Sequence, residues 1–344
     1  MTTPVLAQAR GTRVLVTGAT GYVAGWLVKR LLEAGAIVHA AVRDPSQAGK
    51  IAHLQAMSDA SPGSIAFFKA DLLEAGSHDE AMQGCKIVFH TASPFLLATK
   101  IHDPQRQLVD PAVRGTTDIL EAANRAPSVQ RVVLTSSVAA IGGIPTAAGP
   151  APKGILTEAD WNMTSSLENG PYPYSKTIAE RMAWQIAEAQ DRWRLVVINP
   201  ALVFGPGTAD SQTSGSFDHV RMIGDGTYKD GVPPFQMGMV DVRDVAEAHY
   251  RAGFIADAEG RHIVFGEVHS MGDLVEMLKG AYGDAWPFAK NTALPDAAPR
   301  WKADNSKSKQ ALGLECRPVK DAVIAMFRQL IDTGVLKTNA LKSA

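Results

Sequence analysis

The sequence predicts an α/β fold: a doubly wound parallel sheet with helices on both faces, and a smaller α/β lobe toward the C-terminus. Over the first two thirds of the 344 residues, short apolar, β-branched runs alternate with amphipathic stretches, which is the pattern of repeated βαβ units. A glycine-rich turn follows the first of these runs. The chain is also longer than the roughly 100–200 residues of a typical domain, which favours one large α/β unit or two intimately packed lobes.

Six apolar runs are expected to form the buried parallel strands, over residues 13–17, 36–42, 65–70, 86–92, 131–137 and 194–200. Helices are expected between them, over residues 22–33, 45–57, 78–83, 104–125 and 174–189. Because crossovers between parallel strands are right-handed, these helices must cover both faces of the sheet.

The character of the chain changes after residue 200. Glycine and proline become frequent, as in VFGPGTADSQTSGS and DGTYKDGVPP, and the apolar segments become shorter. We therefore predict that residues 11–200 form the sheet domain, that 239–265 return to it, and that 201–238 and 266–340 form the smaller lobe.

Composition narrows the class of partner. The 34 Lys and Arg residues balance 35 Asp and Glu, so the net charge of −1 provides no electrostatic attraction to nucleic acid or to an anionic membrane. A hydrophobic content of 46% with 20% charged residues is that of a globular protein with a sizeable core. A small molecule is the favoured partner, with the chain a monomer or a homodimer.

Neither cysteine usage nor the start of the chain suggests a metal site or export. Cys85 and Cys316 are far apart and have no metal-ligand spacing, so no disulfide framework and no metal are expected. The initial MTTPVLAQAR lacks the apolar region of a signal peptide, and no window approaches the ~18–20 apolar residues that span a bilayer. A cytoplasmic location is expected.

The glycine-rich turn points to a dinucleotide. In RVLVTGATGYVAGWLVKRLLEAG, Gly18 and Gly21 lie between the first strand and the first helix. Glycine there lets the backbone approach a pyrophosphate, and the helix N-terminus directs its free N–H groups at the same anion. The alternative is a plain strand-to-helix turn, which needs only one glycine. Further contacts are expected from residues in and around this turn: Thr17, Thr20, Tyr22 and Val23.

The residues after the second strand bear on which dinucleotide is bound. An acidic side chain there accepts hydrogen bonds from the adenosine ribose, whereas a cation accommodates a 2′-phosphate. Arg43 occupies this position in VHAAVRDPSQAGK, and Lys50 follows in the next helical stretch. NADP, as NADPH or NADP+, is therefore favoured over NAD. The alternative is a solvent-facing pair of Arg43 with Asp44 that has no role in binding.

Other cofactor contacts are expected at the carboxyl ends of the later strands, where ligands gather in such sheets. Asp71 follows the third strand and could meet the adenine edge, although it could equally cap the following turn. The remaining expected contacts are Leu72, Thr91, Ala92, Ser93, Pro200 and Val203.

A catalytic group is expected at the same edge of the sheet. Ser136 and Ser137 follow the fifth strand, and Tyr172 and Lys176 open the next long helix. A tyrosine and a lysine four residues apart share one helical face, and the ammonium should lower the phenol's pKa from roughly 10. Tyr174 is two residues from Lys176 and points elsewhere, so Tyr172 is expected to be the acid, which also contacts the cofactor with Lys176. The alternative is an exposed helix start with a solvated lysine.

Together these motifs resemble the extended short-chain dehydrogenase/reductase superfamily, with TGATGYVAG, TSS, YPYSK and NPALVFGPG in the expected order. HTASPF, DWN, YSKTIAE and VDVRDVAEAH are similar to its dihydroflavonol-4-reductase-like branch, which includes cinnamoyl-CoA reductases and yeast-type aldehyde and ketone reductases. The resemblance implies a Rossmann-type fold, NADPH and carbonyl reduction. It assigns Ser137 as the catalytic serine beside Tyr172 and Lys176, and Arg43 and Lys50 as phosphate contacts.

Two positions depart from the plant members of this branch. Ala24 stands in place of the third glycine, which is also similar to the yeast-type reductases. Gly142 stands where plant flavonoid reductases carry an asparagine that grips the substrate, which disfavours a flavonoid.

The expected activity is NADPH-dependent reduction of an aldehyde or ketone, that of a carbonyl reductase or alcohol dehydrogenase. Two alternatives remain: a sugar-nucleotide epimerase or dehydratase with the same fold and Ser/Tyr/Lys set, and a non-catalytic NADP-binding redox sensor. An apolar substrate pocket is expected from Phe95, Leu96, Phe204 and Met237, although each could instead be a core residue.

Overall fold

A seven-stranded parallel sheet forms the centre of the molecule. The computed structural model describes residues 9–92, 101–143, 154–296, 298 and 300–337. The strand order is β3-β2-β1-β4-β5-β6-β9, and every neighbouring pair is parallel. The strands are β1 Arg13–Thr17, β2 Ile37–Val42, β3 Ser64–Lys69, β4 Ile87–His90, β5 Arg131–Thr135, β6 Arg194–Pro200 and β9 Gly260–Val264. The doubly wound α/β class predicted from the sequence is confirmed.

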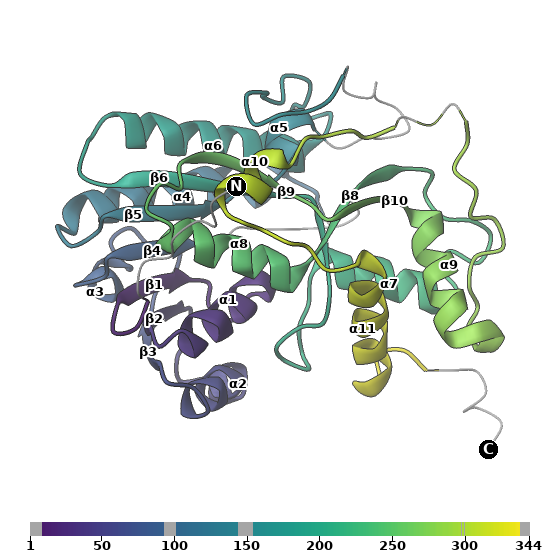
Figure 1. Ribbon diagram of the computed structural model, residues 1–344, viewed down its shortest axis with the longest axis horizontal. Coiled ribbons are helices and arrows are strands. Elements are labelled where there is room, and N and C mark those ends of the chain that lie inside the picture. The colour runs from purple at the N-terminus through teal and green to yellow at the C-terminus, as the bar shows by residue number, and fades with distance from the viewer. Residues whose placement is uncertain (1–8, 93–100, 144–153, 297, 299, 338–344) are drawn as a thin grey trace.

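Helices cover both faces of this sheet (Figure 1). They are α1 Tyr22–Glu33, α2 Ala48–Asp59, α3 Asp79–Met82, α4 Asp110–Arg125, α5 Ala139–Gly142, α6 Pro171–Glu188 and α8 Val242–Phe254, with a π-helical turn η2 at Gln105–Val109. The alternation of side chains along β1 creates one core on each face. Val14 and Val16 pack in the core formed with α1 and α8, whereas Leu15 packs in the core formed with α4 and α6.

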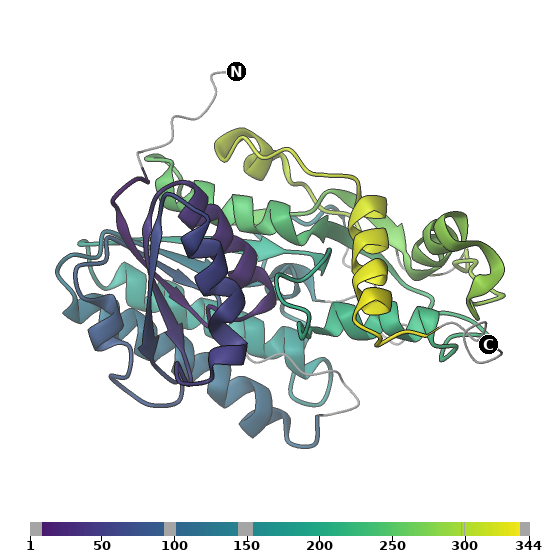
Figure 2. The same ribbon diagram turned by 90° about the horizontal axis from the view of Figure 1, so that it is seen from below.

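A second sheet organises the smaller lobe. It has the order β10-β8-β7, with β7 Leu202–Phe204, β8 Gln236–Asp241 and β10 Glu267–Ser270. Beside it lie α7 Gly215–Gly224, α9 Met271–Tyr282 and α11 Val319–Asp332, with η3 at Gly283–Ala285 and α10 Ser306–Ala311 further along the chain. Figure 2 shows α11 standing between the large sheet and α9. These helices share an apolar core centred on Phe327, which contacts the rings of Tyr282, Trp286 and Phe288.

Several element boundaries differ from those expected. The helix expected over 45–57 begins at Ala48, and the one expected over 174–189 begins at Pro171. The helix expected over 104–125 is divided into η2 and α4, with Pro111 in the first turn of α4. Of residues 239–265, β9 joins the large sheet and α8 packs on α1, but β8 belongs to the smaller sheet.

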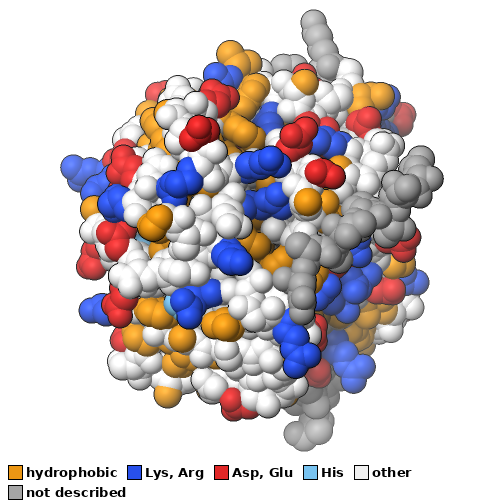
Figure 3. Space-filling model, turned by 60° about the vertical axis from the view of Figure 1, so that its left-hand side comes forward, with side chains coloured by type: hydrophobic (Ala, Val, Ile, Leu, Met, Phe, Trp, Pro, Cys, Tyr) orange, Lys and Arg blue, Asp and Glu red, His pale blue; other side chains and the backbone are white. Residues whose placement is uncertain are grey.

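One face of the molecule is drawn in Figure 3 with its side chains coloured by type. On the face in Figure 3, carboxylates and cationic side chains both appear, with hydrophobic side chains in small groups between them. Within the described ranges, no helix combines the length and apolar character required to cross a membrane.

Candidate active site

The glycine turn after β1 has the geometry of an anion site. Gly18 has a φ of +61°, and a Cβ there would lie 2.9 Å from the Cβ of Ala92. Gly21 is the N-cap residue of α1, and no described side chain caps the first turn. The first-turn amides of α1 therefore point outward without a side-chain acceptor, and the first turn contains no carboxylate. Uncapped amides and a positive helix end together favour a bound anion.

Polar side chains join the ends of β1 and β4 beside this turn. Thr17 is fully buried, and its Oγ1 lies 2.9 Å from His90 Nδ1 and accepts a hydrogen bond from the amide of Ala92 at 3.2 Å. The Thr91 hydroxyl donates to the carbonyl oxygen of Thr17 at 2.6 Å. The two threonines, predicted as cofactor contacts, thus fix the wall against which Gly18 is packed. Ser93 lies outside the described residues.

The side chain of Tyr22 faces away from the glycine turn. Its phenol donates to the carbonyl oxygen of Gly205 at 2.6 Å, and its ring packs edge-on against Phe217. Trp26, one turn later, donates to the carbonyl oxygen of Pro206 at 2.7 Å. Tyr22 therefore anchors the smaller lobe to α1 through its side chain, and only its backbone remains at the turn.

The same loop is held from its other side by α11. The amide of Gly207 donates to Gln329 Oε1 at 2.6 Å, and Gln329 Nε2 donates to the carbonyl oxygen of Ala209 at 3.0 Å. Segment 205–209 is thereby clamped between α1 and α11. Of the other predicted contacts nearby, Val23 and Val203 are partly buried in the apolar cores, Pro200 is buried at the end of β6, and Thr20 is half-buried in the turn.

Arg43 is exposed directly after β2 and makes no ion pair with any residue that the structure describes. The carboxylate of Asp44 instead accepts from the backbone and hydroxyl of Ser46 and from Gln47 Nε2 at 2.8 Å. These hydrogen bonds lower the pKa of Asp44. The solvent-facing Arg43–Asp44 pair considered above is therefore not formed. Lys50 is exposed in the first turn of α2.

Asp71 has the local role that the sequence left open. Its Oδ1 accepts the amide of Leu73 at 2.9 Å, and its backbone is bonded to the Ser77 hydroxyl. Leu72 packs against the Cα of Gly115 on α4. The carboxylate of Asp71 is therefore engaged in its own turn.

Ser137, Tyr172 and Lys176 come together where β5 meets α6. The hydroxyl of Tyr172 is hydrogen-bonded to the Ser137 side chain, and Lys176 Nζ lies 5.9 Å from the centroid of the Tyr172 ring. Ser137 also accepts the amide of Ala139 at 3.1 Å, which fixes its rotamer. Helix α6 begins with Pro171 after Gly170 at a φ of +80°, so Tyr172 lies in its first turn.

Burial dominates the protonation of this pair. It lowers the pKa of Lys176 to about 8 and raises the pKa of Tyr172 to about 12, although part of the Tyr172 side chain remains accessible to solvent. The hydrogen bond with Ser137 opposes the rise at Tyr172, and the charge of Glu180 opposes the fall at Lys176. In the free protein the pKa of Tyr172 is thus raised by burial, whereas the sequence led us to expect the nearby lysine to lower it.

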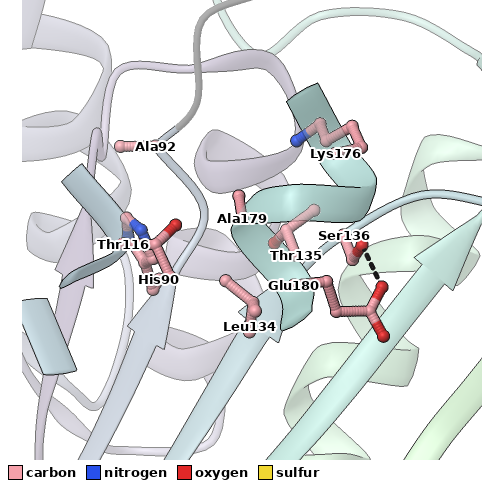
Figure 4. A pocket seen from close by; sticks show the side chains of 9 residues that line it. All are labelled: His90, Ala92, Thr116, Leu134, Thr135, Ser136, Lys176, Ala179 and Glu180. Atoms are coloured by element: carbon pink, nitrogen blue, oxygen red, sulfur yellow. Dashed lines mark hydrogen bonds between the residues drawn. The ribbon is translucent and has the colours of Figure 1, made fainter. Parts of the chain in front are cut away.

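A small cavity is lined by Lys176 and Glu180 of α6. It has a volume of about 10 Å³, which is roughly room for one water molecule. Figure 4 shows Lys176 one turn from Glu180 on α6, with the Glu180 carboxylate directed at Ser136. The other lining residues are His90, Ala92, Thr116, Leu134, Thr135 and Ala179.

The expected pocket residues have different fates. Phe95 and Leu96 lie outside the described residues. Phe204 is fully buried in the core of the smaller lobe, which is the alternative considered for it. Met237 is 5% exposed and packs in an apolar cluster. The same cluster contains Val138, which is the residue after Ser137 in the sequence.

Position 142 borders that apolar cluster. A Cβ on Gly142 would lie 2.4 Å from Leu156 Cδ1, so Leu156 fills the space of a side chain there. Main-chain hydrogen bonds hold Leu156 to the segment after Trp301. The amide of Leu156 donates to the carbonyl oxygen of Lys302 at 3.0 Å, and the amide of Asp304 donates to the carbonyl oxygen of Leu156 at 2.8 Å. The apolar cluster that contains Val138, the residue after Ser137, therefore extends to Gly142.

Across the ranges that the structure describes, no group of three or more His, Cys, Asp or Glu side chains is placed to hold a metal ion. Of the described titratable side chains, Tyr172 is hydrogen-bonded to Ser137, and Lys176 lies beside the Tyr172 ring. The arrangement is suited to proton transfer by Tyr172 beside a dinucleotide site.

The model of the NAD dependent epimerase/dehydratase family matches residues 14–266. The chain belongs to this family. The resemblance to the extended short-chain dehydrogenase/reductases is thereby confirmed, and the chain is an oxidoreductase of that group. Cinnamoyl-CoA reductase CAD2 of Medicago truncatula is 38% identical over 317 residues, which cover 91% of this chain and 94% of that protein.

Solved structures of similar proteins support the fold. Gre2 of Candida albicans in complex with NADPH superposes with a TM-score of 0.79 at 30% identity, covering 94% of this chain and 99% of that one. Yeast methylglyoxal/isovaleraldehyde reductase Gre2, also complexed with NADPH, has a TM-score of 0.78 at 29% identity, with coverage of 94% and 99%.

Sequence reasoning missed three residues that form a buried hydrogen-bond network next to Ser136 and Ser137: Asn199, Glu180 and Arg261. The position of Glu180 four residues after Lys176 in YSKTIAE was a signal for a shared helical face. Nothing local indicated Arg261, which lies 81 residues from Glu180 in the chain.

Proposed function

We propose that this protein is an NADPH-dependent reductase that converts an aldehyde or a ketone to an alcohol. The observation that carries the proposal is the hydrogen bond of Tyr172 with Ser137 beside Lys176, at the sheet edge where the glycine turn lies. This arrangement provides a proton donor, a second hydrogen-bond donor and a cation at the place where ligands bind in doubly wound sheets.

The residues around the glycine turn fit a dinucleotide. The uncapped amides of α1 would hold the pyrophosphate, and Gly18 leaves the backbone bare where it must approach. Arg43 and Lys50 would hold a 2′-phosphate, since both are exposed and Arg43 has no competing ion pair among described residues. When bound, the reduced nicotinamide supplies the hydride to the carbonyl carbon. The NADPH in the two Gre2 structures supports this choice of cofactor.

The protein's own residues manage the oxygen and the proton. Tyr172 would donate its phenolic proton to the substrate oxygen as negative charge develops there, and Ser137 would hydrogen-bond the same oxygen. Lys176, while protonated, would stabilise the phenolate that remains and bind the nicotinamide ribose hydroxyls. Since the Lys176 pKa is about 8, this ammonium is present at neutral pH.

The substrate is proposed to be a small molecule with an apolar body. Leu156, Ile141 and Val138 pack in one apolar cluster next to Ser137 in the chain. The related proteins act on cinnamoyl-CoA or, in yeast, on methylglyoxal and isovaleraldehyde, as their names state. Residues 11–200 with 239–265 would hold the cofactor, and 201–238 with 266–340 would cover the substrate.

The test is NADPH consumption with a panel of aldehydes, diketones, ketoesters, aryl ketones and acyl-CoA thioesters. Tyr172→Phe should lose roughly 10²–10⁴-fold in kcat, the range for general acid catalysis, while NADPH still binds. Tyr174→Phe is the matched control and should retain turnover, because Tyr174 lies on another side of α6. Tightly bound NAD with no carbonyl reduction would favour the epimerase alternative. Cofactor-dependent behaviour that survives Tyr172→Phe would favour the sensor.

A further inference from the structure

Glu180 is a buried carboxylate at the junction of three elements. It lies on α6 one turn after Lys176, and its side chain is fully buried. Four described side chains donate to it. Oε2 accepts from the Ser136 hydroxyl and from Asn199 Nδ2 at 2.8 Å, and Oε1 accepts from Arg261 Nε at 2.6 Å and from Trp184 Nε1 at 3.4 Å.

These bonds connect α6, which carries Tyr172, to the segment after β5, which carries Ser137, and to β6. Ser136 immediately precedes Ser137, and Asn199 also donates to the carbonyl oxygen of Ser137 at 3.2 Å. A shift of α6 along β5 would therefore have to break the bonds of Glu180 to both strands. Charge-assisted bonds in a buried site are among the stronger polar contacts in a protein, so this tie is stiff.

Arg261 is the cation paired with Glu180. Its guanidinium lies on β9, donates to the carbonyl oxygens of Glu158 and Asp160, and stacks 4.0 Å from the centroid of the Trp161 ring. These contacts hold Arg261 in place, although its Nη2 is buried with no hydrogen-bond partner among the described residues, and its Nε pairs with the Glu180 carboxylate at 2.6 Å.

The charge of Glu180 is placed to act on Lys176. Residues four apart on a helix are neighbours, and both side chains line the small cavity. Among the residues that the structure describes, the titratable groups beside Lys176 are Tyr172 and Glu180 on its own helix and His90 from β4, whereas Arg261 on β9 acts through Glu180. His90 is neutral at neutral pH, because burial lowers its pKa to about 3. Glu180 is therefore the anion that favours the charged form of Lys176.

We propose that Glu180 is a positioning residue of the active site: it locks α6 to the ends of β5 and β6, and it places a fixed negative charge one turn from the Lys176 ammonium. This inference rests on the proposed function for its effect on turnover, but its effect on Lys176 belongs to the free protein. A merely structural carboxylate would stabilise the fold without setting the charge of the lysine.

The experiment measures the ionisation of Lys176 directly, by NMR titration of the free protein carrying isotope-labelled lysine, with Lys176→Arg to assign the signal. Glu180→Gln removes the charge and keeps the size of the side chain, so the Lys176 midpoint should fall by about one pH unit. Arg261→Gln leaves Glu180 with its other three donors but without its cation, so the midpoint should rise. Ser136→Ala, which removes one neutral donor, should leave it within about 0.3 unit.

The pH dependence of activity should shift in the same direction as the Lys176 midpoint. Since the protonated lysine is required, activity of Glu180→Gln should decline at a lower pH than that of the wild type, by the same shift. Glu180→Asp retains the charge and should restore most of the wild-type midpoint. A Lys176 midpoint unmoved by Glu180→Gln, or moved in the same direction by Arg261→Gln, overturns the proposal. If Glu180→Gln does not fold, the direction of the Arg261→Gln shift decides.

The two proposals can fail separately. Absence of carbonyl reduction in the wild type would remove the proposed function but leave the Lys176 titration interpretable. An unmoved titration in an active reductase would remove only the role of Glu180.

Discussion

Removal of the Arg43 guanidinium should weaken NADPH binding selectively. The side chain is exposed and has no ion pair with any described residue, while Asp44 is occupied by Ser46 and Gln47. Arg43→Ala therefore strands no partner, and the free energy of unfolding should change by less than about 0.5 kcal/mol. What is lost is the charge-assisted contact with the 2′-phosphate, worth roughly 1.5–3 kcal/mol, which is about 10- to 150-fold in Kd.

The assay is a fluorescence titration with NADPH and NADH at one fixed salt concentration, because exposed charges are screened by salt. The Kd for NADH should change by less than about threefold, since NADH has no 2′-phosphate. Lys50→Ala, in the first turn of α2, removes a neighbouring cation and is the variant to compare with Arg43→Ala. Equal weakening of both cofactors, or no weakening of NADPH, would refute the assignment of Arg43.

Three further predictions concern the frame around the site. Gly18→Ala should lose cofactor binding and about 1–3 kcal/mol of stability, because the residue has a φ of +61° and its Cβ would lie 2.9 Å from that of Ala92; calorimetry of NADPH binding and thermal unfolding measures both. Tyr22→Phe should cost about 1–3 kcal/mol in urea unfolding, since it leaves the buried carbonyl of Gly205 without its donor, and an unchanged midpoint would contradict this. Stability should also fall as the pH drops below about 6.5, by up to about 1.4 kcal/mol per pH unit for each histidine that burial keeps neutral in the fold but that protonates on unfolding. These histidines have pKa values lowered to about 3, 4 and 3: His90, His249 and His262. Urea midpoints measured at several pH values test the slope.

Local pattern was sufficient for much of the fold. The strand at 194–200 and the helix at 22–33 have the bounds expected from their apolar residues. The strand is buried on both faces, and the helix buries one continuous face. The sequence did not reveal that the helix expected over 104–125 is divided into η2 and α4. Pro111 has no N–H to bond residue 107, so the backbone before it adopts the wider π turn instead of a regular helix.

The proximity of Tyr172 and Lys176 was likewise predictable from local pattern. The four-residue spacing of Tyr172 and Lys176 is a local signal, whereas the partners of Glu180 come from strands far along the chain. The burial that sets the pKa of Tyr172 is likewise a property of the packed structure, and no spacing of residues could reveal it. The phenol of Tyr22 illustrates a third limit, since its acceptor lies 183 residues away.

The clamp on segment 205–209 bears on how molecules enter and leave. A hinge that parted the two lobes would break the bonds from Tyr22, Trp26 and Gln329 together. We therefore expect the lobes to stay joined through the catalytic cycle and traffic of substrate and product to pass through the mouth of the site. Gln329, on the last described helix, would then help to keep the two lobes joined while molecules enter and leave.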